Sequence, residues 1–80
     1  MDPIEVTARF DPQGKFTPLS FVWNRRTYRV DSIGRRWDGK DGKHILVMTP
    51  GNRAHHLLFA TDKGKWYIVR GGDVPTIPKV

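Results

Sequence analysis

Short apolar segments recur along this 80-residue chain, and residues that favour turns separate them. In the first segment, Ile4, Val6, Ala8 and Phe10 alternate with polar residues, which is the pattern of a strand with one buried face. No stretch of the sequence has the 3.6-residue periodicity of an amphipathic helix. The chain is therefore predicted to be all-β.

Six strands are predicted, at residues 4–10, 19–23, 26–30, 44–49, 57–59 and 66–69. Asn24 and Arg25 lie between two of them and predict a tight hairpin turn, with Asn24 in a left-handed conformation. The segment 44–49 is apolar on both faces and is predicted to be a central strand. Residues 38–43 read DGKDGK and predict a flexible polar loop.

Six short strands joined mostly by short turns predict an antiparallel meander, which must curl to bury a face in so few residues. The expected architecture is a small barrel or half-barrel of SH3-like or OB-like size. Residues 1–73 are predicted to form a single domain, and 74–80 an extended tail, because Pro75 and Pro78 cannot donate to a strand ladder. The predicted core contains the large aromatic side chains Phe21, Trp23, Tyr28, Phe59 and Trp66.

The charge of the chain predicts an anionic partner. Fourteen Lys and Arg residues against eight Asp and Glu give a net charge of +6. Five arginines and one aspartate lie in residues 25–37, so this segment carries two-thirds of the net charge. A concentrated basic segment is typical of proteins that bind nucleic acid, although charge also serves solubility.

The basic segment supplies most of the candidate site. With Tyr28 facing the core, the arginines at 25 and 29 are predicted to line the opposite face. Trp37 follows two further arginines and offers a stacking surface for a base, or else belongs to the core. The candidate nucleic-acid-binding residues are Arg25, Arg29, Arg35, Arg36, Trp37, Lys40, Lys43 and Tyr67.

The predicted function is a nucleic-acid-binding module that favours single strands and has no catalytic activity. The alternative is a protein–protein interaction module that uses exposed strand edges or the C-terminal tail. In that case the arginines serve solubility, or pair with Asp31, Asp38 and Asp41.

Other site chemistries are disfavoured by the residues themselves. The segment from Gly34 to Lys40 has the glycine and lysine spacing of a P-loop, but Asp41 stands where the Mg²⁺-binding Ser or Thr is needed. The chain has no cysteine, and His55 and His56 are adjacent and point to opposite faces of a strand. No metal, cofactor or small-molecule substrate is predicted. The absence of a leader and of a long apolar run predicts a cytoplasmic protein without membrane contact.

Several aromatic and basic motifs have a familiar order: FVWNRRTYRV at 21–30, Arg36-Trp37, the strands around 44–48 and 57–59, and GKWYIV at 64–69. Over about residues 18–70 the chain resembles a bacterial domain of unknown function. That domain occurs in small stand-alone proteins and at the ends of some Y-family polymerase-like proteins. The chain departs from it by carrying Ile68 at the usual leucine and by its proline-containing tail. The resemblance implies a small all-β fold and a loose association with DNA-processing contexts, and it assigns no site residues. A protein partner in DNA processing is therefore among the expected partners.

Overall fold

The computed structural model describes residues 1–70, and these form seven strands and no helix. The strands are β1 (Asp2–Phe10), β2 (Phe16–Trp23), β3 (Arg26–Arg29), β4 (Ser32–Gly39), β5 (Gly42–Thr49), β6 (Arg53–Ala60) and β7 (Lys65–Val69). The all-β prediction is confirmed, with one strand more than predicted. Residues 1–70 hold no helix that could cross a membrane. The predicted tail and the domain boundary at residue 73 lie outside the described residues.

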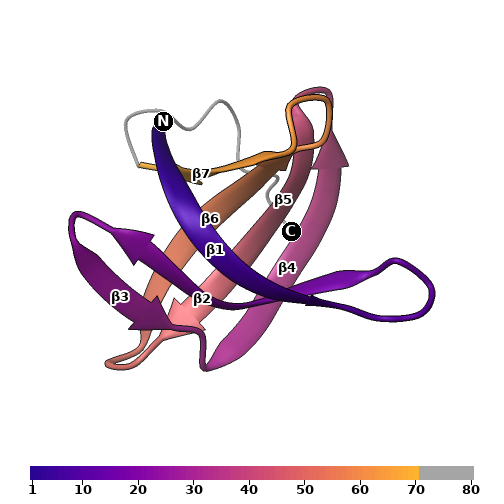
Figure 1. Cartoon of the computed structure of the whole chain (residues 1–80). Coiled ribbons are helices and arrows are strands. Elements are labelled where there is room, and N and C mark those ends of the chain that lie inside the picture. The colour runs from indigo at the N-terminus through magenta and orange to yellow at the C-terminus, as the bar shows by residue number, and fades with distance from the viewer. Residues whose placement is uncertain (71–80) are drawn as a thin grey trace.

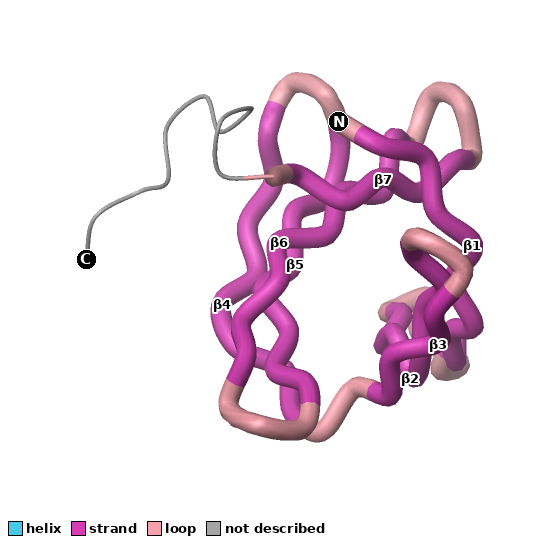
Figure 2. Tube along the Cα trace, turned by 90° about the vertical axis from the view of Figure 1, so that its left-hand side faces the viewer, coloured by secondary structure: helices cyan, strands magenta, loops and turns pink. Residues whose placement is uncertain are grey.

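All the strands belong to one antiparallel sheet in the order β3-β2-β1-β7-β6-β5-β4. β1 joins the two halves of this sheet, because Asp2–Ile4 pair with β7 and the rest of the strand pairs with β2. In Figure 2 the sheet curls around an interior, with β4, β5 and β6 on one side and β2 and β3 on the other. The predicted curled meander is confirmed as a half-barrel.

The two end strands of the sheet, β3 and β4, follow one another in the chain. The residues that link them are tied to both halves: the Val30 amide donates to the Leu19 carbonyl (2.9 Å) and the Asp31 amide to that of Met48 (2.7 Å). The linker therefore brings the two ends of the sheet toward each other, at the bottom of Figure 1. Beyond it, no strand ladder within residues 1–70 joins β4 to β2, so a seam remains between these strands.

The core lies inside the curl and is built from both halves of the sheet. Its buried members are Phe16, Phe21, Ile45, Val47, Leu57 and Ile68. The Phe16 ring packs edge-on against Phe59 and Trp66, with ring centroids 5.4 and 5.3 Å away. The five aromatic residues predicted for the core all belong to it or pack against it, Phe21 being buried and the others partly so.

Two local predictions from the sequence are confirmed. Asn24 and Arg25 have φ angles of 53° and 63°, and they connect β2 to β3 in the left-handed conformation expected of a tight hairpin. β5 lies between β4 and β6 and buries residues on both of its faces. A strand with neighbours on both sides and apolar residues on both faces is the central strand that the sequence indicated.

The seventh strand, β4, was not predicted. Its residues alternate poorly because a β-bulge interrupts the pairing: Gly34 and Arg35 together oppose Leu46, between the pairs Ile33↔Val47 and Arg36↔Ile45. The bulge places Arg36 on the same face as Ile33, which a regular period of two would place on opposite faces.

The prediction of a flexible loop at residues 38–43 was wrong. Asp38 and Gly39 end β4, Gly42 and Lys43 begin β5, and the register Gly39↔Gly42 leaves a turn of only two residues. Glycine and aspartate are common in loops, but they also suit the ends of a tight hairpin, and composition does not separate the two.

Candidate nucleic-acid interface

A pocket of about 400 Å³ lies at the seam, where the turn between β1 and β2 faces β4 and β5. It is lined by Gln13, Gly14, Lys15, Phe16, Arg36, Trp37, Asp38, Lys43, His44 and Ile45. Three of these residues are cations and one is a carboxylate, so the lining has two positive charges in excess. The pocket thus gathers positive charge beside the segment of β4 that carries Trp37.

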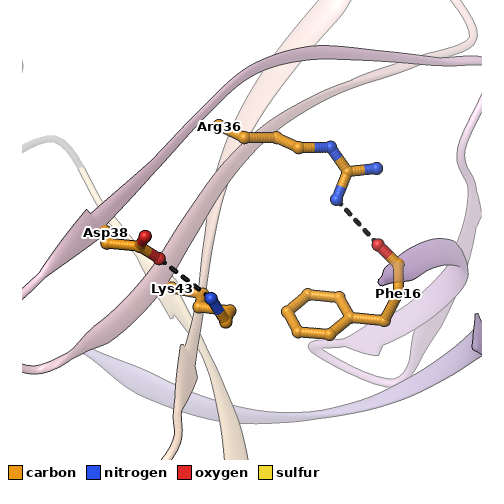
Figure 3. Close-up of polar contacts among 4 residues, drawn as sticks. All are labelled: Phe16, Arg36, Asp38 and Lys43. Atoms are coloured by element: carbon orange, nitrogen blue, oxygen red, sulfur yellow. Dashed lines mark hydrogen bonds and ion pairs between the residues drawn. The ribbon is translucent and has the colours of Figure 1, made fainter. Parts of the chain in front are cut away.

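Arg36 spans the seam. Its Nη1 donates to the carbonyl oxygen of Phe16 (2.7 Å) and its Nη2 reaches Thr17 Oγ1 (3.3 Å), so a side chain connects β4 to β2 where no ladder does. Figure 3 shows the guanidinium reaching across to that carbonyl. Arg36 therefore stabilises the fold as well as contributing charge to the pocket.

The other charges of the pocket are close to the β4–β5 turn and the β1–β2 turn. Lys43 Nζ lies 3.0 Å from Asp38 Oδ1, and both side chains are well exposed (Figure 3). An exposed pair of this kind stabilises little and can exchange partners readily. Lys15 is exposed and enters the lining from the end of the β1–β2 turn. These two lysines are available to an incoming anion.

Trp37 lies on the outer face of the half-barrel, opposite the core. It pairs across the ladder with His44, and the two rings stack with centroids 5.1 Å apart and an interplanar angle of 7°. The indole also meets the ring of His56 at 5.1 Å. The sequence left open whether Trp37 is core or surface; it is a half-buried residue whose ring is fixed by two histidines outside the core.

His44 and His56 form a hydrogen-bonded chain that ends on a carboxylate. Asp41 Oδ1 lies 2.7 Å from His44 Nε2, and His44 Nδ1 lies 2.8 Å from His56 Nε2. Both histidines are buried, with 5% and 7% of their surface exposed. The sequence analysis considered His55 and His56 only as metal ligands and did not identify this chain.

The surroundings of Asp41, His55 and His56 lower the pKa of each of these groups. Burial by itself would raise the pKa of Asp41, but hydrogen bonds from His44 and from its own backbone, with attraction from the two histidines, hold that pKa below 3.8. Burial lowers the pKa of His56 below 6.5; charge on His44 lowers it further, and Asp41 opposes the shift. Burial, with the charge of Arg53, also lowers the pKa of His55. Asp41 is therefore ionised and His56 neutral at pH 7.

An Asp–His pair can serve as a catalytic base, but this one is poorly placed for that role. Both ring nitrogens of His44 are already within hydrogen-bonding distance of a partner, and the ring is almost completely buried. A general base must reach the proton that it removes. The arrangement is better suited to fixing the ring under Trp37.

The structure brings together some of the predicted site residues and separates others. Arg36, Trp37 and Lys43 line the pocket. Arg35 lies in the bulge beside them, and Lys40 is exposed in the β4–β5 turn.

The remaining three predicted residues lie outside the pocket lining. Arg25 is in the β2–β3 turn, and Arg29 ends β3 with its Nε 3.4 Å from Asp31 Oδ1. Tyr67 is half-buried in β7, opposite Leu58 and Pro3. Of the two arginines predicted to share one strand face, Arg29 lies on β3 and Arg25 lies in the turn that precedes this strand.

Sequence reasoning missed Lys15 and the two histidines that contact Trp37. A signal for the histidines was present, because a turn at 50–52 that pairs residue 49 with 53 also pairs residue 46 with 56 and residue 44 with 58. His44 and His56 then become diagonal neighbours on one face, within reach of long side chains. Within residues 1–70, no group of three or more His, Cys, Asp or Glu side chains is arranged to hold a metal ion.

The two lowered histidine pKa values predict that stability falls with decreasing pH. In the unfolded chain both histidines titrate near 6.5, whereas in the fold they resist protonation. The neutral rings of His55 and His56 therefore contribute fully to the free energy of unfolding above pH 6.5. This contribution is lost as the pH falls through 6.5 toward the lowered pKa values of the folded protein.

Thermal melts between about pH 8 and pH 5 should show Tm decreasing by about 4–8 °C for each kcal/mol lost. A Tm that stays constant or rises over this interval would contradict the burial of these rings.

No family model, no curated protein and no solved structure matches the chain. The resemblance noted from the sequence motifs stays a prediction.

Proposed function

We propose that the protein binds nucleic acid, favouring single strands over duplex, at the seam pocket. The observation that carries the proposal is the lining of the pocket, where Lys15, Arg36 and Lys43 surround the same space that Trp37 borders. Lysine and arginine bind phosphate, and an indole ring stacks on any base. These are the two contacts that a single-stranded nucleic acid offers.

The size of the pocket supports a single strand. Its volume of about 400 Å³ suits a ligand of the size of one nucleotide unit. In a duplex the bases are paired and stacked on one another, so their faces are not available to Trp37. A single strand presents phosphate and base separately.

The position of β4 at the end of the sheet lets one strand reach both kinds of contact. β4 has a ladder partner only in β5, so its other edge is not covered by a strand within residues 1–70. Arg36 and Trp37 are adjacent and point to opposite faces of β4. A nucleic acid that passes over this edge can place a phosphate beside Arg36 and the neighbouring base beside Trp37.

A titration with labelled single- and double-stranded oligonucleotides tests the proposal. We expect the single strand to bind more tightly than the duplex. In a plot of the logarithm of the binding constant against the logarithm of the salt concentration, the steepness of the slope should fall by about 0.7 for each phosphate contact removed. Lys15→Ala and Lys43→Ala should each flatten the slope by about one contact, equally for all base sequences, because phosphate contacts carry no base information.

Lys63→Ala is the matched control, because Lys63 is an exposed lysine in the β6–β7 turn and does not line the pocket. It should leave the slope close to that of the unaltered protein. If Lys63→Ala weakens binding as much as Lys15→Ala, the pocket is not the binding site. If no oligonucleotide binds at about 50 mM salt, the proposed function is wrong.

The free edge of β4 also supports a second candidate, an interaction module that adds a strand from a partner protein to the sheet. Such an interface depends on backbone hydrogen bonds, so its affinity should change little with salt or with Lys15→Ala. The version that uses the C-terminal tail lies outside the described residues. A protein partner in DNA processing and a cytoplasmic location stay predictions of the sequence.

A further inference from the structure

The hydrogen bonds of the Asp41–His44–His56 chain fix where its protons lie. An ionised carboxylate only accepts, so His44 carries its proton on Nε2 and donates it to Asp41. Nδ1 of neutral His44 then accepts, and His56 donates to it from Nε2. His56 Nδ1 is left with a lone pair, and it is buried with no hydrogen-bond partner among the described residues. The neutral chain therefore has one unsatisfied acceptor.

Adding one proton to this chain changes its charge without disrupting its geometry. A proton that arrives at His56 Nδ1 is balanced by transfer of the Nε2 proton of His56 to Nδ1 of His44, over the 2.8 Å between them. His44 then carries protons on both nitrogens and donates to Asp41 and to His56, while His56 stays neutral. The positive charge comes to lie on His44.

His44 is the better of the two positions for that charge. Its ring contacts the Asp41 carboxylate on one edge and the flat face of Trp37 on the other side, and both favour a cation. Burial makes a charged His56 unfavourable and lowers its pKa. The titratable groups that act on the His56 ring are His44 and Asp41. The carboxylate is thus the counter-ion of the charged form.

The charged ring lies under Trp37 on the outer face of β5, next to the nucleic-acid pocket. His44 lines the pocket together with Lys15, Arg36 and Lys43. Protonation cancels the negative charge of Asp41 at this edge of the pocket and adds a cation under the indole that receives the base. Both changes act in the direction that favours a phosphate.

We propose that protonation of the Asp41–His44–His56 chain strengthens the binding of single-stranded nucleic acid at the seam pocket, so that the protein binds more tightly in mildly acidic than in alkaline solution. This inference rests on the proposed function, and it assigns to His44 a positioning role for Trp37 and a regulatory role through its charge. Histidine is the side chain whose charge changes in this interval of pH.

The first test is the affinity for a labelled single-stranded oligonucleotide at constant salt, from about pH 8 to about pH 6. The unaltered protein should bind about three- to tenfold more tightly at the lower pH, as one added charge near the phosphate implies. His44→Gln keeps a hydrogen-bonding side chain that cannot be charged, and its affinity should not vary with pH. His55→Gln is the control, because His55 packs on the inner face beside Thr49 and should leave the pH dependence intact.

The second test needs no variant. Long-range ¹H–¹⁵N spectra of the unaltered protein should show His44 and His56 protonated on Nε2 at about pH 8, and His44 protonated on both nitrogens at lower pH. A proton on Nδ1 of His44 in the alkaline form would overturn the inference.

The outcomes separate the two proposals. If the oligonucleotide binds but the pH profiles of the unaltered protein and His44→Gln coincide, the inference is wrong and the proposed function stands. If no oligonucleotide binds at any pH, both are wrong.

Discussion

Gly42→Ala should destabilise the fold by about 3–5 kcal/mol, a loss comparable with the whole stability of many small domains. Gly42 is buried at the start of β5 and has a φ angle of 143°, in the region that L-residues rarely adopt. A Cβ built there overlaps the carbonyl oxygen of Phe59. That oxygen belongs to the backbone of β6, so the clash cannot be relieved by a side-chain rotation. Equilibrium denaturation in urea measures the loss.

Gly51→Ala is the matched control for this variant. Gly51 also has a positive φ, of 88°, but a Cβ at this position meets no atom within 4 Å. It should cost only about 1 kcal/mol, the strain of the backbone conformation alone. Equal losses for the two variants would show that the approach of Phe59 to Gly42 contributes nothing.

Trp37→Ala should weaken the binding of single-stranded oligonucleotides by about 1–3 kcal/mol, which corresponds to about five- to 150-fold in affinity. Trp37 is one of the residues that line the pocket. Its indole ring lies outside the core and stacks on His44. Its removal takes away the surface on which a base would stack and leaves Lys15 and Lys43 in place. The salt slope should therefore stay close to that of the unaltered protein.

The conservative variant separates stacking from folding. Trp37→Phe keeps a ring that can contact both His44 and a base, so it should lose much less affinity than Trp37→Ala. Because Trp37 is half-buried and outside the core, Trp37→Ala should also cost less stability than Phe21→Ala, for which about 3–5 kcal/mol is expected. Unchanged affinity in Trp37→Ala, or equal losses in both Trp37 variants, would contradict the stacking role.

Local patterns in the sequence were sufficient for most of the fold. The alternation from Ile4 to Phe10 predicted a half-buried strand, and β1 half-buries Ile4, Val6 and Ala8 on that side, whereas Phe10 at its end is exposed. Asn24 predicted the tight turn because a left-handed conformation costs it little. In both cases the physical cause lies within a few residues of the position concerned, so the sequence shows it directly.

β4 and its site could not be predicted in the same way. The bulge at Gly34 and Arg35 shifts the pairing by one residue, so the faces of Ile33 and Arg36 depend on how β5 is aligned. The contact of Arg36 with the Phe16 carbonyl depends on the curl of the whole sheet. Lys15 likewise enters the pocket through tertiary structure, since it is distant in sequence from every other cation there.

The division of the sheet also determines which part of folding carries the largest entropic cost. β1, β2 and β3 pair only with sequence neighbours within their half, as do β4 to β7, and closing such short hairpins costs little chain entropy. The ladder between β1 and β7 consists of the pairs Asp2↔Ile68, Pro3↔Tyr67 and Ile4↔Trp66. These three pairs close a loop of almost the full described length, so the cooperativity between the two halves depends on the most demanding closure in the molecule.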